Sequence, residues 1–467
     1  MQKSKLESES KSFAALRGQY KTFHYHGCHL SQGDGCVVLR FDFAIDGLCD
    51  FHPETVILTD NLRICNAIDT PTAQKIAFSL GLAELISYWK CACPPQVVIH
   101  CGTLTKQEQN WWKRLWFHGL GEFFYRNQIE TAQNDFLRLD VREAACCAPP
   151  KAFECADLRL VPVGGGKDSC VTLDLLRQTG KPLMGFTVND QPARAETFAA
   201  AGFAPEQMLR ARRKIDPTLL LRNREGFLNG HTPFSAIVAF LGLFAAYLVG
   251  ADEIVLSNEA SANESSVLGT DINHQYSKSF AFERDFHAYV RKSIGVPIRY
   301  FSLLRPFHEL QIAKQFAALP QFHRAFKSCN VGSKQNIWCG KCAKCLFVAL
   351  ILAPFLPPDA LAAIFGKDMF DDPDLLSEFR ALLGQSQAKP FECVGTVNEA
   401  AAALGLTIAR YESQSLPLPR LLAACRAFAL PPHAAARLLG DFNPENLIPP
   451  MLQSQIERMF SFVRGSA

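Results

Sequence analysis

Ten residues at 161–170, Val-Pro-Val-Gly-Gly-Gly-Lys-Asp-Ser-Cys, combine three glycines with a lysine, an aspartate and a serine. Glycines let backbone N–H groups approach an anion closely, and a lysine and a hydroxyl add a charge and a donor. A phosphate group is the ligand that this combination suits best. The alternative is a glycine-rich turn without a ligand, but such a turn does not need Lys167, Asp168 and Ser169.

Two common phosphate-binding patterns do not fit this run. The Walker pattern G-x-x-x-x-G-K-[ST] fails because Val161 and Asp168 stand where it needs a glycine and a hydroxyl. The dinucleotide pattern G-x-G-x-x-G fails at Ser169. The run instead resembles the PP-loop, Ser-Gly-Gly-x-Asp-Ser, of enzymes that split ATP into AMP and pyrophosphate, with Gly164 in place of the first serine.

Four cysteines form a second motif with the spacing C-x9-C-x2-C-x2-C. Four thiolates suit one tetrahedral Zn²⁺, and the neighbouring Lys341 and Lys344 would offset its negative charge. The spacing also resembles the zinc loop of 7-cyano-7-deazaguanine synthases, which share the PP-loop. We therefore expect a structural zinc; the alternatives are reduced cysteines on a loop, or an active-site role for the first of them. The four are Cys329, Cys339, Cys342 and Cys345.

Apolar periodicity predicts the elements that position the glycines. We expect a strand over 158–163 and a helix over 168–179, which places the glycines at a strand-to-helix turn. The alternation of strands and helices that continues after this turn predicts a parallel sheet wound with helices, whose ligands bind at the carboxyl ends of the strands. The further strands are expected at 182–188, 208–210, 252–257 and 298–303, and the helices near 193–200 and at 232–249, 280–293 and 308–318.

Polar clusters fall where these strands end or helices begin, so we expect several of them to face the same crevice as the glycines. Thr232 is the expected N-cap of the long apolar helix, with Pro233 at its first position and Gly250 just past its end. The clusters are Asn229-Gly230-His231, Ser257-Asn258-Glu259, Asn273-His274-Gln275 and Arg305.

Three regions are expected along the chain. Residues 1–150 combine β-type alternation over 20–58 with helices at about 72–90 and 105–126, which predicts an α+β N-terminal domain ended by a linker-like stretch at 146–151. Aromatic residues at 111–125 have helical spacing, which favours a core over a base-stacking surface. Residues 151–350 are expected to form the catalytic domain, and 351–467 a helical C-terminal region.

Composition narrows the classes of function. Among the 467 residues, 48 basic and 45 acidic residues leave a net charge of +3, which weighs against a nucleic-acid partner. The apolar stretches at 234–249 and 345–356 are shorter than the roughly 18 residues of a membrane-spanning helix. With no apolar signal segment near the start and 17 cysteines, which suit a reducing compartment, we expect a cytoplasmic protein without a membrane partner. The sequence does not indicate an oligomeric state.

Seven short motifs together resemble the MurL family, the UDP-N-acetylmuramoyl-L-alanyl-L-glutamate epimerases of bacterial peptidoglycan synthesis. They cover about half of the chain, and it is their combination that is specific. Besides the glycine run, they are Asn-Gly-His-Thr-Pro at 229–233, Ser-Asn-Glu-Ala-Ser-Ala at 257–262, Asn-His-Gln-Tyr-Ser-Lys-Ser at 273–279, Phe-Ser-Leu-Leu-Arg-Pro at 301–306, Trp-Cys-Gly-x-Cys-x-x-Cys at 338–345 and Lys-Pro-Phe-Glu-Cys-Val-Gly at 389–395.

The resemblance implies that ATP and Mg²⁺ are used to invert the terminal L-glutamate of this UDP-muramoyl dipeptide, with release of AMP and pyrophosphate. The need for ATP is intelligible, because a proton α to a carboxylate is very weakly acidic. Joining the carboxylate to AMP removes its charge and makes it electron-withdrawing, so the proton can leave and return from the opposite face.

Roles follow for the motif residues. Gly164, Gly165, Gly166, Lys167 and Ser169 are expected to hold the phosphates, with Asp168 near Mg²⁺ or fixing the loop and Asn258 at the nucleotide. The proton transfers are expected from His231 and His274, with Glu259 and Glu264 as alternatives, and Lys278 and Arg305 are expected to bind the substrate's carboxylate or pyrophosphate.

Two other functions stay open at this stage. One is another PP-loop adenylating enzyme acting on tRNA or a nucleobase, against which the near-neutral charge and the motifs at 301–306 and 389–395 argue. The other is a non-catalytic ATP-binding regulator, against which the intact Lys167-Asp168-Ser169 argues.

Overall fold

A computed structural model describes residues 11–60, 62–143, 153–267 and 269–464. The chain folds into two compact units, each built from segments that are separated in the sequence. The linker-like stretch at 146–151 lies outside the described residues. Unit 1 comprises Met1–Ala156, Arg210–Ala251 and Ala288–Ile298, and unit 2 comprises Asp157–Leu209, Asp252–His287 and Arg299–Ala467.

The sheet of unit 1 is mostly antiparallel. Its strand order is β9-β4-β2-β1-β5-β6, with β3 paired to β2. β1 pairs antiparallel with β2 and parallel with β5. The expected alternation is confirmed, because Val37, Leu39, Phe41 and Phe43 are all buried on one face. The strands are β1 (Thr22–Gly33), β2 (Cys36–Ile45), β3 (Cys49–Phe51), β4 (Glu54–Leu58), β5 (Gln96–Leu104), β6 (Arg138–Glu143) and β9 (Met208–Lys214).

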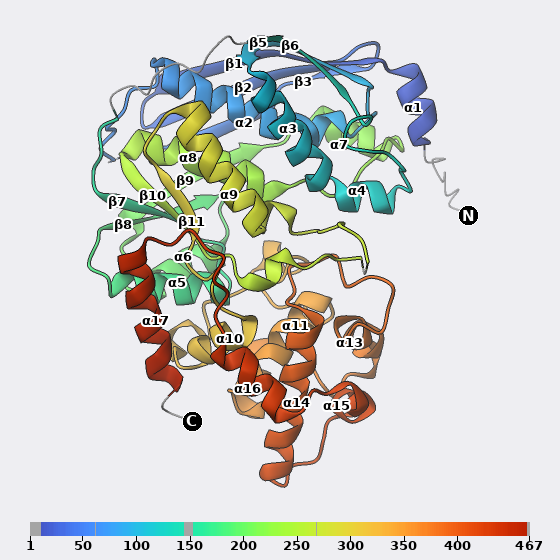
Figure 1. Ribbon diagram of the computed structural model, residues 1–467, viewed down its shortest axis with the longest axis vertical. Helices are drawn as coiled ribbons and strands as arrows, with labels where there is room; N and C mark the ends of the chain where they lie inside the picture. Colours follow the sequence, from blue (N-terminus) through green and yellow to red (C-terminus); the bar gives the residue numbers. More distant parts are fainter. Residues whose placement is uncertain (1–10, 61, 144–152, 268, 465–467) are drawn as a thin grey trace, which may run out of the picture. The chain divides into compact units, whose positions relative to one another are not determined.

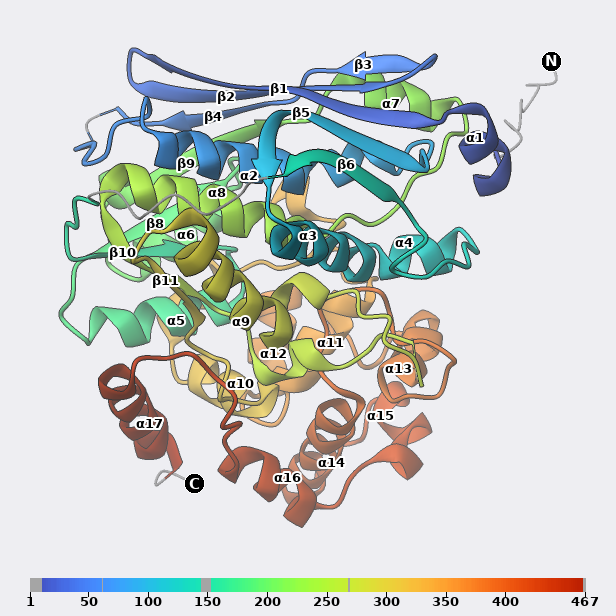
Figure 2. The same ribbon diagram turned by 45° about the horizontal axis from the view of Figure 1, so that its top comes forward.

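The helices of unit 1 pack on this sheet and on one another. Figure 2 shows α2 lying along the face of β1 and β2, and α2 also packs against α8. The expected single helix at 105–126 is two helices, because the chain turns at Leu120 between Gly119 and Gly121. Most of its aromatic residues are buried or partly buried, as expected: Trp112 is buried and stacks on Phe240, whereas Tyr125 is 41% exposed. The helices are α1 (Phe13–Gln19), α2 (Pro71–Trp89), α3 (Lys106–Gly119), α4 (Gly121–Arg126), α7 (Pro217–Arg224) and α8 (Phe234–Val249).

The start of α8 corrects one prediction. Pro233, rather than Thr232, is the N-cap, and the helix begins at Phe234. The hydroxyl of Thr232 is engaged elsewhere, because it accepts a hydrogen bond from Lys90 Nζ at 2.7 Å. The predicted end is confirmed, since Gly250 caps the helix with a left-handed φ of 71°.

Unit 2 contains the parallel strands expected after the glycine run. Their order is β11-β10-β7-β8, with β7 parallel to β8 and β10 parallel to β11 (Figure 1). The strand expected at 208–210 is longer than predicted: β9 continues to Lys214 and pairs antiparallel with β4, and its added end buries Ala211 while it leaves Arg212 and Lys214 exposed. The strands are β7 (Leu158–Pro162), β8 (Leu183–Val188), β10 (Ala251–Leu256) and β11 (Arg299–Ser302).

The C-terminal part of unit 2 is helical, as expected. α10 packs against α5 and α11, and α14 packs against α11 and α16 (orange to red in Figure 1). In the described ranges, no helix combines the length and apolar character needed to cross a membrane. The helices are α5 (Lys167–Arg177), α6 (Pro192–Ala200), α9 (Phe280–Tyr289), α10 (Glu309–Ala317), α11 (Ala343–Leu352), α12 (Pro358–Phe365), α13 (Leu376–Leu382), α14 (Val397–Ser413), α15 (Arg420–Ala424), α16 (Pro432–Gly440) and α17 (Pro450–Arg464).

Candidate active site

The glycine run forms the predicted turn between β7 and α5. Gly165 has a φ of +83°, which a side chain would disfavour, and the N–H of Gly164 donates to Ser169 Oγ at 3.0 Å. Gly166 is the N-cap of α5 and supplies no side-chain cap. The first N–H groups of α5 therefore lack a side-chain acceptor, an arrangement that suits an anion.

Lys167 is held between two carboxylates. Its Nζ lies 2.5 Å from Asp168 Oδ1 and also pairs with Glu309, the first residue of α10. Burial acts to lower the pKa of Lys167, but the carboxylates of Asp168 and Glu309 raise it, so the ammonium is charged. Burial acts to raise the pKa of Glu309 above its usual range, and the positive charge of Lys167 opposes this effect. Glu309 is thus a functional candidate that the motifs had not indicated.

A second buried carboxylate lies behind Glu309. Glu399 accepts the N–H of Glu309 at 2.7 Å, and it also accepts bonds from the N–H and hydroxyl of Thr396, at 2.8 and 2.9 Å. Burial acts to raise the pKa of Glu399, but hydrogen bonds from His308, Thr396 and Glu309 lower it. Glu399 is therefore a charged anchor for the start of α10.

Arg305 joins the loops that follow β10. Its guanidinium is fully buried and donates to Glu283 Oε2 at 2.9 Å and to the carbonyl oxygens of Glu259 and Lys278, at 2.6 and 2.5 Å. These bonds fix the backbone at Glu259 and Lys278. Because the guanidinium already donates to these protein groups, the substrate-binding role expected for Arg305 stays a prediction.

The residues after β10 lie where the parallel strands end. Asn258 donates from Nδ2 to Ser302 Oγ at 3.0 Å, which ties the end of β10 to the end of β11. Glu259 is buried, and its Oε1 accepts a bond from Ser261 Oγ at 3.1 Å. The charge of Glu259 acts on both Lys278 and Glu309, so Glu259 belongs to the same electrostatic cluster as the glycine loop.

Residues 389–395, called here the 389–395 segment, dock against this cluster. Lys389 donates its N–H to the carbonyl of Ser266 at 2.9 Å, and its Nζ pairs with Glu264. Lys344, in the first turn of α11, donates its N–H to Glu392 Oε2 at 2.9 Å, and its Nζ donates to the carbonyl of Cys393. The segment is therefore held from two sides, which fixes Cys393 in place.

Cys393 faces two of the predicted site residues. Lys278 Nζ donates to its sulfur at 2.9 Å, and the His274 side chain makes a hydrogen bond with it. The N–H of His274 also donates to Ser266 Oγ at 3.1 Å. The structure thus brings His274 and Lys278 together around Cys393, a residue of the 389–395 motif to which the sequence had assigned no role.

The other predicted histidine, His231, belongs to unit 1. Its Nδ1 lies 3.4 Å from Glu122 Oε2. Lys90 Nζ donates to the carbonyl of Gly230 and to Thr232 Oγ1, and burial lowers the pKa of Lys90 to about 8. These contacts hold the 229–233 turn within unit 1, and the catalytic role of His231 stays a prediction.

The four cysteines of the second motif converge. The sulfur–sulfur distances are 3.9 Å for Cys329–Cys342, 3.7 Å for Cys339–Cys345 and 3.5 Å for Cys342–Cys345, and all four sulfurs lie within 4.8 Å of one another. Zn–S bonds of about 2.3 Å in a tetrahedron require sulfurs about 3.8 Å apart. The four residues therefore fit one tetrahedral zinc. Cys342 is also the N-cap of α11, so the cluster fixes the helix that carries Lys344.

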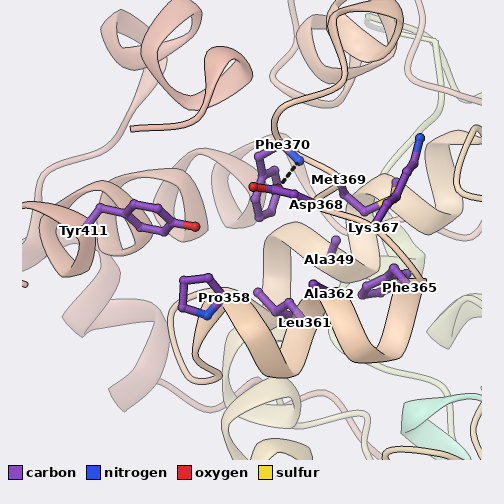
Figure 3. Close-up of a pocket in the computed structure, with 10 residues that line it drawn as sticks. All are labelled: Ala349, Pro358, Leu361, Ala362, Phe365, Lys367, Asp368, Met369, Phe370 and Tyr411. Atoms are coloured by element: carbon purple, nitrogen blue, oxygen red, sulfur yellow. Dashed lines mark hydrogen bonds between the residues drawn. The ribbon is translucent and has the colours of Figure 1, made fainter. Parts of the chain in front are cut away.

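A pocket also lies in unit 2, between α11, α12 and α14 (Figure 3). Its wall is mainly apolar, and the carboxylate of Asp368 in this wall accepts the N–H of Phe370 at 2.8 Å. Its lining includes neither the glycine loop nor the surroundings of Cys393. The candidate active site is therefore the group of charged residues around Lys167, Glu309 and Lys278, and not this pocket. The lining residues are Ala349, Pro358, Leu361, Ala362, Phe365, Lys367, Asp368, Met369, Phe370 and Tyr411.

Comparisons with known proteins agree on one family. A model of the MurL N-terminal domain matches residues 14–303, and a model of the MurL C-terminal domain matches residues 323–432. A protein of Xanthomonas oryzae pv. oryzae is 34% identical over 95% of this chain and 98% of its own length. Proteins of a Micromonospora species and of Salinispora tropica are 34% and 35% identical, over 92% and 82% of this chain and 96% and 84% of their own lengths. All three are named UDP-N-acetyl-alpha-D-muramoyl-L-alanyl-L-glutamate epimerase.

The fold and these relatives define the class of this protein: it is a mixed α/β enzyme of the isomerases, the class to which epimerases belong. The chain belongs to the MurL family, as its motifs indicated.

Proposed function

We propose that this enzyme inverts the terminal L-glutamate of UDP-N-acetylmuramoyl-L-alanyl-L-glutamate to D-glutamate, in an ATP- and Mg²⁺-dependent reaction that passes through an acyl-adenylate and releases AMP and pyrophosphate. The names of the three relatives support the substrate. The use of ATP is supported by the strand–glycine–helix turn with Lys167, whose charged neighbours extend to Glu259 and Lys278. The observation that carries the proposal is that the charged side chains beside the glycine turn extend to Glu259 and Lys278.

The chain's residues divide the work in the following way. The glycine loop, the start of α5 and Lys167 bind the phosphates of ATP and offset their charge. Adenylation of a glutamate carboxylate then makes its α-proton removable, because the carboxylate no longer repels the forming negative charge. Asn258 is proposed to face the nucleotide, and Lys278 and Arg305 remain the proposed substrate-binding residues.

Magnesium is proposed to bind at the carboxylates beside Lys167. Mg²⁺ prefers oxygen ligands and binds through one or two carboxylates together with substrate phosphates, and Asp168, Glu259 and Glu309 provide such oxygens. When bound, the ion supplies positive charge that offsets the phosphates of ATP. Asp168 is the most accessible of the three, since 26% of its side chain is exposed.

The acid–base groups expected from the sequence remain proposals. His231 and His274 stay candidates for proton transfer, and Glu259 and Glu264 stay alternatives. His274 has the stronger support because its ring meets Cys393 in the charged cluster, whereas Glu264 is paired with Lys389.

The four-cysteine cluster is proposed to hold a structural zinc. The distances between its sulfur atoms support one tetrahedral ion. At the start of α11, the N–H of Cys345 donates to Cys342 Sγ at 3.5 Å. The role is structural because the cluster already provides four ligands, which leaves no open position for a substrate.

One experiment tests the function and its rivals together. In D₂O with Mg²⁺ and the dipeptide substrate, the enzyme should form AMP and pyrophosphate and place deuterium at the glutamate Cα only when ATP is present. An ATP analogue blocked at the α–β bridge should not replace ATP. A regulator would release no AMP, another adenylating enzyme would ignore this substrate, and deuterium exchange without nucleotide would contradict activation by adenylation.

A further inference from the structure

Cys393 stands out among the cysteines of unit 2 that lie outside the four-cysteine cluster. Cys170 and Cys425 are buried, and burial raises the pKa of both thiols. Cys393 is only partly buried, and an ammonium nitrogen lies 2.9 Å from its sulfur. Its surroundings therefore favour a thiolate, the form in which cysteine acts as a base or nucleophile.

Positive charge reaches Cys393 from three separate elements. Lys278 comes from the turn before α9, His274 from the loop that precedes this turn, and Lys344 from the first turn of α11. The one carboxylate beside it in sequence, Glu392, is engaged by the N–H of Lys344. Burial alone raises the pKa of the Cys393 thiol, but Lys278, the hydrogen bond with His274 and the charge of Lys344 lower it to about 6.

The thiol is also connected to the phosphate-binding turn. The charges of Glu259 and Asp168 both act on Lys278, which places the Lys278–Cys393 pair within electrostatic reach of the glycine loop. A carboxylate activated at that loop would bring its own α-carbon near the pair. Cys170 also lies within reach of the charge of Asp168, but burial keeps its thiol protonated, so Cys393 is the better candidate for a thiolate beside the loop.

We propose that the Cys393 thiolate is the base that removes the α-proton of the activated glutamate, with Lys278 and His274 as its positioning residues. This inference rests on the proposed function. The Cα–H bond breaks and an S–H bond forms, while the electron pair of the broken bond moves into the acyl group as an enolate. A protonated side chain on the opposite face returns a proton to Cα. The Cys393 thiol then passes its proton through His274 to solvent, and the opposite acid takes one back from solvent.

The central test separates activation from proton removal. The Cys393→Ser variant keeps the size of the side chain but replaces the thiol with a hydroxyl that is not ionised near neutral pH. It should form AMP at a rate close to that of the unaltered enzyme, whereas deuterium incorporation and inversion from the L-substrate should fall by about 100-fold or more. Cys36→Ser is the matched control, because Cys36 is another partly buried cysteine and lies in β2 of unit 1.

The outcomes distinguish this inference from the proposed function. Exchange at the unaltered rate in Cys393→Ser, with AMP formation intact, would overturn the inference alone. A glutamyl group found attached to Cys393 by peptide mass mapping would show a nucleophile instead of a base, and would also overturn it. Absence of AMP formation by the unaltered enzyme would overturn the proposed function and this inference with it.

A second measurement needs no turnover and no cysteine substitution. The rate at which iodoacetamide alkylates Cys393, followed by mass spectrometry, should rise with pH, and the midpoint of this rise should lie at about pH 6. In Lys278→Met the midpoint should move to higher pH, because the thiolate loses its nearest positive charge. A midpoint near the ordinary thiol value of about 8.5 in the unaltered enzyme would overturn the inference.

Discussion

The carboxylate of Glu399 accepts a hydrogen bond from the backbone N–H of Glu309 at 2.7 Å, so one buried side chain joins the first turn of α14 to the first residue of α10. The same carboxylate completes a capping box with Thr396. Because Glu309 in turn pairs with Lys167, the position of this lysine, which is proposed to bind phosphate, depends on a residue of the C-terminal helices. The glycine loop is therefore connected to the C-terminal helices through the contacts from Glu399 to Glu309 and from Glu309 to Lys167.

Replacing Glu399 by Gln should weaken this connection. A neutral amide is a poorer acceptor for the N–H of Glu309 and the two donors of Thr396, so the free energy of unfolding should fall by about 1–3 kcal/mol. AMP formation should also slow, because Glu309 no longer fixes Lys167. Urea denaturation measures the first effect. Glu412→Gln, an exposed position of the same helix paired with Arg426, should change neither quantity appreciably.

The same variant predicts a pH effect with a definite sign. The pKa of Glu399 is lower in the folded protein than its ordinary value, because hydrogen bonds outweigh the effect of burial. Its stabilising contribution is therefore complete above the unfolded pKa of about 4.3 and is lost as the pH falls through the folded value. The stability difference between the unaltered enzyme and Glu399→Gln should shrink on acidification below about pH 4. A difference that grows there would contradict the assignment.

Gly395 permits the close approach of these elements. An added Cβ would lie 2.7 Å from Phe347 Cζ and 3.0 Å from both Glu309 Cγ and Glu399 Oε2. Gly395→Ala should therefore lower the free energy of unfolding by about 1–3 kcal/mol, and it should reduce AMP formation by displacing Glu309. Gly440→Ala is the matched control, since a Cβ there would meet nothing within 4 Å. Equal thermal stability of the two variants would contradict this account.

The sequence predicted the parts of the fold that have strong local signals. The glycine run lies between a strand and a helix because Gly165 takes a positive φ and apolar runs flank it. The four cysteines could be grouped because three of them fall within seven residues. The mixed α/β class and the helical C-terminal part followed from periodicity, whereas Thr232 was wrongly assigned as a cap because its partner, Lys90, is distant in sequence.

The rest of the candidate site depends on contacts between distant residues. Glu309 and Lys167 are separated by 142 positions, and Lys278 and Cys393 by 115, so no local spacing indicates either pair. Glu399 reads as an ordinary capping residue until its second bond, to Glu309, is known. The division into two discontinuous units could not be predicted from the sequence either, because β9 and α8 follow the glycine run in sequence but mostly belong to unit 1.

Asp168 is the most direct test of phosphate and metal binding. Asp168→Asn removes a carboxylate that pairs with Lys167 and is proposed to contact Mg²⁺, so AMP formation should be abolished while the circular dichroism spectrum is unchanged. The matched control is Asp359→Asn, which makes the same change in the first turn of another helix, α12, and should leave AMP formation intact. Full activity of Asp168→Asn would contradict the role of this residue.

The last prediction concerns the zinc and its connection to Cys393. Protein purified without added metal should contain close to one zinc per chain, and the double variant Cys342→Ser, Cys345→Ser should lose it together with solubility. Cys425→Ser, a buried cysteine of α15's C-cap, should keep the metal. Metal-free protein that remains active would show that the cluster is not a zinc site.

Partial removal of the zinc tests how the four-cysteine cluster is connected to Cys393. Cys342 caps α11, and Lys344 in the first turn of that helix holds Glu392 and the carbonyl of Cys393. Partial removal of zinc by a chelator should therefore loosen the 389–395 segment and raise the pH midpoint of Cys393 alkylation before the rest of unit 2 unfolds, because the thiolate loses the positive charge of Lys344. Hydrogen exchange should increase in this segment at the same chelator concentration. An unchanged alkylation midpoint after zinc loss would mean that Lys278 and His274 hold Cys393 without help from the start of α11.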